Sequence, residues 1–76
     1  MSVQVKHSLT LRGHRTSVTL EDEFWQAFTR IARTRGLSVN ALASEIDEAR
    51  RSEQGLASAI RLFCLAWYQQ QASQQG

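Results

Sequence analysis

The feature that most constrains the fold of this chain is a short run of strict two-residue alternation at residues 15–20. Side chains suited to a core occupy the even positions: Thr16, Val18 and Leu20. Polar side chains occupy the odd positions: Arg15, Ser17 and Thr19. This alternation predicts a β-strand with one buried and one exposed face. No other segment predicts a strand of similar strength, so the backbone edges of this strand lack an obvious partner within the chain. We therefore expect it to pair with a second copy, as a two-stranded antiparallel ribbon across a dimer axis.

The size of the chain also favours assembly. A domain of 76 residues buries a modest core, and small domains commonly add disulfides, a metal or a partner subunit. Cys64 is the only cysteine, so a disulfide within the chain is excluded. No cluster of potential ligands has metal-binding spacing, and we expect no cofactor. Oligomerisation is the remaining route.

The charge distribution indicates which end meets an anionic partner. The net charge is +2, which is too small to identify a nucleic-acid ligand. Residues 1–20 contain Lys6, Arg12 and Arg15 but no acidic residue, whereas six acidic residues and three arginines lie between residues 21 and 48. The strand end is thus the positive end, where attraction to phosphates would be useful. Uneven charge is also common in short soluble chains.

Around this strand, the sequence predicts an N-terminal arm and three helices. Residues 1–12 form an arm or extended segment whose weak alternation at odd positions changes phase at Thr16, so a break or bulge is expected near Gly13. A first helix spans about residues 22–35, with Glu21 or Asp22 as its cap. A second helix begins after Ser38, a strong N-cap candidate, and ends near residue 49. A linker at 50–55, a third helix at 56–70 and a frayed tail at 71–76 complete the chain.

The aromatic residues of these helices occur at helical spacing, which favours a core role over a stacking platform for bases. They are Phe24, Trp25, Phe28, Phe63 and Trp67. The third helix is apolar on more than one face, which predicts that it packs against its own chain and against a partner.

The run Gly13–Glu21, the acidic helix start, and the Gly36-Leu37-Ser38 turn before a second helix together resemble the ribbon-helix-helix fold, the Arc and MetJ class. With Phe24-Trp25, the run is also similar to small bacterial proteins of that fold. The resemblance covers residues 13–49, and the third helix is an addition to the minimal fold, which either thickens the core or binds another protein or a second dimer. It implies a mostly α-helical protein with one short strand, which pairs across an intertwined homodimer.

The resemblance also implies a sequence-specific DNA-binding protein that acts as a homodimeric transcriptional repressor. In this family the outward strand residues enter the major groove, and here they are Arg15, Ser17 and Thr19. Arginine can donate two hydrogen bonds to guanine, and serine and threonine can bond either kind of base. The N-terminus of the second helix holds a backbone phosphate, which corresponds to Ser38, Val39 and Asn40. Arg12 and His14 flank the ribbon and are further candidates for phosphate contacts.

Two other function classes are weighed against this prediction. Catalysis is disfavoured, because no nucleophile elbow, phosphate-binding glycine loop or metal motif is present, and Cys64 has no evident activating base. The alternative is a protein-interaction module or an antitoxin-like protein, in which the third helix binds a partner protein. The absence of a signal peptide or a membrane span predicts a cytoplasmic, bacterial-type protein.

Overall fold

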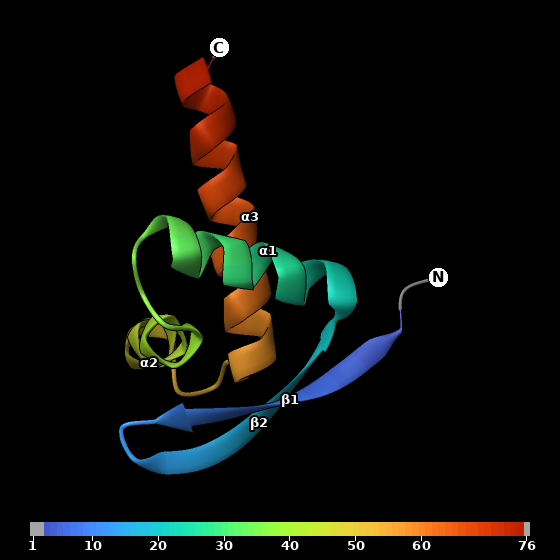
Figure 1. Ribbon diagram of the computed structural model, residues 1–76, viewed down its shortest axis with the longest axis vertical. Coiled ribbons are helices and arrows are strands. Elements are labelled where there is room, and N and C mark those ends of the chain that lie inside the picture. The colour runs from blue at the N-terminus through green and yellow to red at the C-terminus, as the bar shows by residue number, and fades with distance from the viewer. Residues whose placement is uncertain (1–2, 76) are drawn as a thin grey trace.

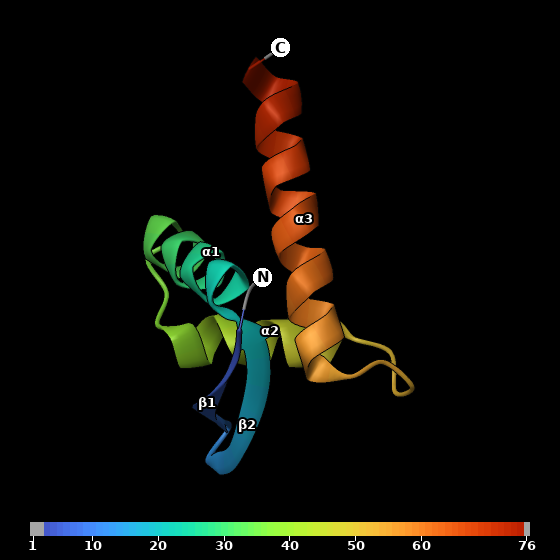
Figure 2. The ribbon, with the colours of Figure 1, turned by 90° about the vertical axis from the view of Figure 1, so that its right-hand side faces the viewer.

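The computed structural model describes residues 3–75. A β-hairpin at the N-terminus is followed by three helices (Figure 1). The elements are β1 (Gln4–Leu11), β2 (His14–Glu21), α1 (Asp22–Thr34), α2 (Val39–Ala49) and α3 (Leu56–Gln75). All three helices lie on one side of the hairpin, and α3 stands on α2 with its C-terminal half extending away from the rest of the chain (Figures 1 and 2).

The prediction that the strand at residues 15–20 has no partner within the chain was wrong. Residues 4–11, which were expected to be an arm or extended segment, form β1 and pair antiparallel with β2 along its whole length. The chain therefore contains two strands rather than one short one, and each has eight residues.

The turn explains why the alternation changes phase. Leu11 pairs with His14, so only Arg12 and Gly13 connect the strands, with φ of 52° and 81°. Two positive φ values are the signature of a two-residue hairpin turn, which glycine adopts without strain. In such a register, odd positions of β1 lie opposite even positions of β2, as in the Leu9–Thr16 pair. The predicted bulge near Gly13 is therefore the hairpin turn itself.

Helix α1 begins directly after the hairpin with acidic residues in its first turn, where negative charge interacts favourably with the positive end of the helix dipole. Glu21 is the N-cap residue, but its side chain makes no capping hydrogen bond. It instead accepts hydrogen bonds from Gln4 and Arg61, each at 2.9 Å. The helix ends before Gly36, whose φ of 70° is the left-handed conformation typical of a helix stop.

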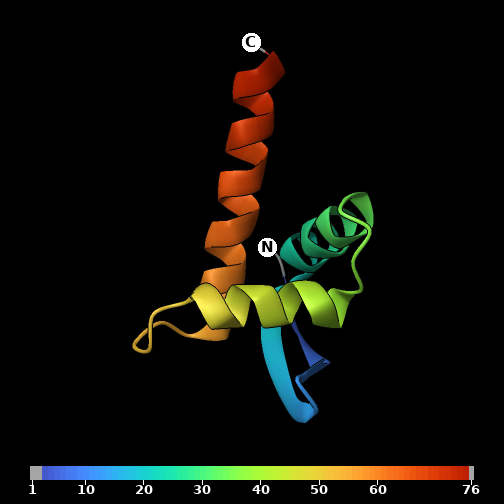
Figure 3. The same cartoon turned by 90° about the vertical axis from the view of Figure 1, so that its left-hand side faces the viewer.

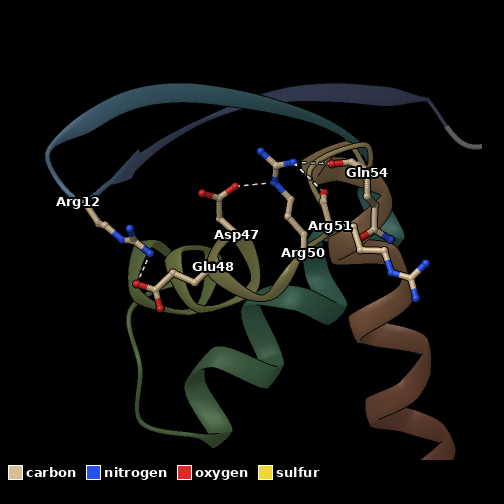
Figure 4. Close-up of polar contacts among 6 residues, drawn as sticks. All are labelled: Arg12, Asp47, Glu48, Arg50, Arg51 and Gln54. Carbon is tan, nitrogen blue, oxygen red and sulfur yellow. Dashed lines mark hydrogen bonds and ion pairs between the residues drawn. The ribbon is translucent and has the colours of Figure 1, made fainter.

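Helix α2 begins as its sequence predicts. Ser38 is its N-cap, and the Ser38 hydroxyl accepts a hydrogen bond from the backbone N–H of Ala41 at 3.0 Å. After Ala49 the chain turns through residues 50–55. Arg50 anchors this turn, since its guanidinium contacts Asp47 at 2.7 Å and the carbonyl of Gln54 at 2.6 Å (Figure 4).

Helix α3 is longer than predicted. It continues to Gln75 rather than ending at residue 70, so residues expected to fray are helical, and Gly76 lies outside the described residues. The sequence from Leu56 to Gln75 contains neither glycine nor proline, so nothing in it interrupts the helix. No helix among residues 3–75 is long and apolar enough to cross a membrane.

The core lies between the hairpin and the helices. Its buried residues are Leu9, Val18, Leu20, Phe28, Ile31, Ala32, Leu42, Ala43, Ile46, Ala59, Ile60 and Cys64. Trp25, Phe63 and Trp67 are half-buried around it, which agrees with the core role predicted for the aromatic residues. Every element thus contributes to one core, including β1 and α3, which lie outside the region on which the resemblance was based.

Candidate nucleic-acid interface

The outward face of the hairpin is a flat polar surface. Antiparallel partners share a face, and the pairs on the outward face are Lys6–Thr19, Ser8–Ser17 and Thr10–Arg15. All six side chains are exposed. The opposite face carries Leu9, Val18 and Leu20, which are buried against the helices. The hairpin is thereby anchored on one side and open on the other (Figure 1).

The charge on this face is positive. Lys6 and Arg15 are its cations, with four hydroxyl groups around them. The single carboxylate is that of Glu21, which lies at the α1 end opposite Gln4. Its hydrogen bonds to Arg61 and Gln4 lower the Glu21 pKa from 4.5 to about 2, so it stays ionised but is neutralised by Arg61. The rest of the face can approach an anion without repulsion.

The three residues predicted to contact bases share this face. Arg15, Ser17 and Thr19 are exposed along β2 and alternate with buried neighbours. Thr16, predicted to point inward, is on the inner face opposite Leu9 but is exposed there. The sequence reasoning missed the β1 half of the surface, which is Lys6, Ser8 and Thr10. The signal that could have found them was the odd-position alternation before Gly13.

The residues predicted to hold a phosphate lie beside the hairpin. The first turn of α2 packs against β1, and the Oδ1 atom of Asn40 accepts a hydrogen bond from the backbone N–H of Thr10 at 3.0 Å. This contact ties the helix end to the strand. The first hydrogen bond within α2 is donated by the backbone N–H of Leu42 to the carbonyl oxygen of Ser38, at 3.0 Å. Because helical bonds begin there, the N–H groups of Val39 and Asn40 have no acceptor within the helix. Such groups suit a phosphate, although the Asn40 side chain is already engaged.

Arg12 and His14 flank the turn but differ in their surroundings. Arg12 forms an ion pair with Glu48 of α2, which links the hairpin tip to that helix (Figure 4). Both side chains are 58% exposed, and an exposed ion pair of this kind contributes little stability. His14 pairs with Leu11 and therefore lies on the inner face, away from Arg15. The two residues line a hollow of about 310 Å³ between the hairpin tip and Arg50.

Cys64 and His7, the side chains with potential catalytic chemistry, lie among apolar or aromatic residues. Cys64 is buried in the core, and burial raises its thiol pKa to about 11, so it is protonated at neutral pH and a poor nucleophile. His7 stacks on Trp25, with 3.8 Å between the ring centroids. Among residues 3–75, no group of three or more His, Cys, Asp or Glu side chains could hold a metal ion.

Comparison with known proteins identifies the domain. A family model described as a ribbon-helix-helix domain matches residues 4–68, a range that includes both strands, α1, α2 and most of α3. No curated protein and no solved structure gives a significant match to the chain.

Proposed function

Because the chain belongs to the ribbon-helix-helix family, whose domains are DNA-binding regulators, we propose that it binds specific DNA sites through the outward face of its own hairpin. The observation that carries this proposal is the row of exposed basic and hydroxyl side chains on both strands. Arg15, Ser17 and Thr19 read base edges, and Lys6, Ser8 and Thr10 extend the surface. We further propose that the protein represses transcription in the bacterial cytoplasm by occupying promoter DNA.

The hairpin of one chain has the right dimensions for this role. A two-stranded ribbon fits the major groove, which is about 12 Å wide. If a second copy paired with the open edge of β2, the resulting four strands would span about 14 Å between the outer strand axes, at about 4.8 Å per step. With their side chains, such a sheet is too wide for the groove. We therefore assign the ribbon to a single chain rather than to two strands shared across a dimer.

Phosphate contacts set the position of the ribbon in the groove. The start of α2 lies beside β1, where the Asn40–Thr10 hydrogen bond holds it. Free N–H groups of Val39 and Asn40 can therefore meet the DNA backbone next to the strand that reads the bases. Arg12 can exchange its exposed Glu48 partner for a phosphate. His14, on the inner face, has the weakest claim to such a contact.

The first experiment is a fluorescence-anisotropy titration with duplexes tiled across the upstream region of the protein's own gene, against scrambled duplex, at two salt concentrations. We expect sequence-dependent binding that weakens steeply with salt, since neutralised phosphates release counterions. Arg15→Ala should weaken specific binding by roughly 1–3 kcal/mol and relax specificity at one position per half-site.

The matched control is Arg33→Ala. Arg33 is an exposed arginine near the end of α1, so this variant loses the same charge away from the hairpin. It should retain both affinity and specificity. If the Arg15→Ala variant binds the specific duplex and the random duplex with the same affinities as the Arg33→Ala variant does, the hairpin face does not read bases. A promoter-reporter assay with the same variants then tests repression.

A further inference from the structure

Glu48, near the end of α2, lies where a carboxylate is unfavourable for the helix. The C-terminus of a helix carries partial negative charge, so cations are favoured in its last turn. The last turn of α2 contains no basic residue, and Asp47 and Glu48 lie there instead. Asp47 is neutralised locally, because Arg50 donates a hydrogen bond to it at 2.7 Å. Glu48 has no such partner within residues 39–55, so its position needs another explanation.

The partner of Glu48 comes from the hairpin. Helix α2 lies between the hairpin and α1 (Figure 3). At the turn of the hairpin, Arg12 reaches the end of α2 and forms an ion pair with Glu48 (Figure 4). Both side chains are largely exposed, and an exposed ion pair contributes little to stability. A gain in stability therefore does not account for a carboxylate at this position.

The ion pair masks one of the three cationic side chains of the hairpin. Lys6 and Arg15, on the outward face, form no ion pair with any of residues 3–75. Arg12 is held by a carboxylate. Carboxylate and phosphate oxygens are equivalent acceptors for a guanidinium group. Glu48 therefore occupies donors of Arg12 that a DNA phosphate would otherwise take.

We propose that Glu48 is an autoinhibitory residue, which holds Arg12 in the free protein and competes with DNA phosphates for its guanidinium. This inference rests on the proposed function, since it requires DNA at the hairpin. DNA gains the Arg12 contact only by displacing Glu48. The competition weakens binding to every duplex by a similar factor, because a phosphate contact carries no sequence information. Glu48 thereby keeps the affinity for random DNA low, which comes almost entirely from phosphate contacts.

Anisotropy titrations with scrambled duplex test this competition without knowledge of the specific site. Glu48→Gln removes the charge and nearly preserves the size of the side chain. We expect this variant to bind about 2- to 5-fold more tightly than the wild type at low salt. The slope of log affinity against log salt concentration should also steepen by about 0.9, the value for one more neutralised phosphate.

The matched control is Glu45→Gln. Glu45 is another exposed carboxylate of α2, and it pairs with Arg35 at 3.1 Å rather than with the hairpin. This variant changes the net charge of the protein by the same amount, so it measures the effect of charge alone. It should bind more weakly than Glu48→Gln, with an affinity close to that of the wild type. Circular dichroism checks that both variants keep their helices.

A double-mutant cycle with Arg12→Ala shows whether the effect depends on Arg12. In the Arg12→Ala background, Glu48→Gln should strengthen binding no more than Glu45→Gln does. Equal affinities of the two single glutamine variants, or a full gain that persists without Arg12, would overturn the inference while leaving the DNA-binding proposal standing. A wild type that binds no duplex at low salt would overturn the proposed function and this inference together.

Discussion

At the scale of single residues, Glu21 is the side chain whose ionisation is most altered by folding. Its pKa falls from 4.5 to about 2, chiefly because Arg61 donates a hydrogen bond to it and also because Gln4 does so. A carboxyl group with a lowered folded-state pKa stabilises the fold fully above its unfolded pKa and loses that contribution as the pH falls through the folded value. The window therefore runs from about pH 4.5 down to about pH 2.

We expect the free energy of unfolding of the wild type to fall more steeply across this window than that of Glu21→Gln. Urea denaturation at a series of pH values measures the difference. Arg61→Met removes the main hydrogen-bond donor to the Glu21 carboxylate. The free energy of unfolding of this variant should therefore also fall less steeply across the window than that of the wild type. Equal slopes for all three proteins would mean that the ion pair does not couple folding to protonation.

Local sequence patterns correctly predicted which side chains of β2 lie on its outward face and which residue caps α2. The exposure of Arg15, Ser17 and Thr19 follows from strand periodicity alone, and the Ser38 cap from its position before an apolar run. The engagement of Asn40 by Thr10 joins residues 30 positions apart. No local pattern encodes such a contact, since it depends on how the hairpin and α2 pack.

At the scale of secondary structure, the two-residue turn is the feature that makes the hairpin. Arg12 and Gly13 both have positive φ, a conformation that costs roughly 1–2 kcal/mol for a residue with a side chain. Gly13→Ala should therefore lower the free energy of unfolding by about 1 kcal/mol, measured by urea denaturation.

The control for that substitution is Gly55→Ser. Gly55 directly precedes α3, has open space around it and has no positive φ, and serine is a favourable residue before a helix. Its stability should be unchanged or slightly raised. If the two glycine substitutions cost the same, the loss at Gly13 does not arise from the turn conformation.

The same turn explains the error in the predicted fold. The alternation of residues 3–11 is visible in the sequence, but it places apolar residues at odd positions, whereas residues 15–20 place them at even positions. A continuous strand cannot change phase without a break or bulge, so the sequence predicts one near Gly13. A hairpin reverses direction, and then opposite phases place apolar residues on the same face. Gly13 preceded by arginine is a weaker turn signal than asparagine or aspartate before glycine, so local chemistry did not reveal the reversal.

At the scale of the whole molecule, β1 and α3 change what the domain needs from a partner. The predicted dimer was inferred from an unpaired strand, and β1 supplies that pairing within the chain. Leu9 of β1 and Ile60 of α3 complete a core with no buried polar residue among those described. Dimerisation, which is general for this fold, is therefore expected to serve DNA recognition more than the completion of the core.

The dimensions of the chain lead to a prediction about the DNA site. The principal extents are 40 × 30 × 25 Å, which are comparable with one DNA helical turn, roughly 34 Å, so two copies bound side by side can place their hairpins on successive turns of one face of the duplex. We expect a two-fold related site with half-site centres 10–10.5 base pairs apart. Inserting about 5 base pairs between the half-sites turns them to opposite faces of the duplex, which should abolish joint binding in an anisotropy titration.

A duplex with about 10 inserted base pairs is the control for this spacing effect. Its half-sites return to the same face of the duplex, so it should recover more of the joint binding than the duplex with about 5 inserted base pairs. Equal affinities for the two duplexes would show that the two ribbons are not held in fixed geometry. Since a flexible link between copies would give that result, the spacing experiment measures how rigidly two copies hold their hairpins relative to each other.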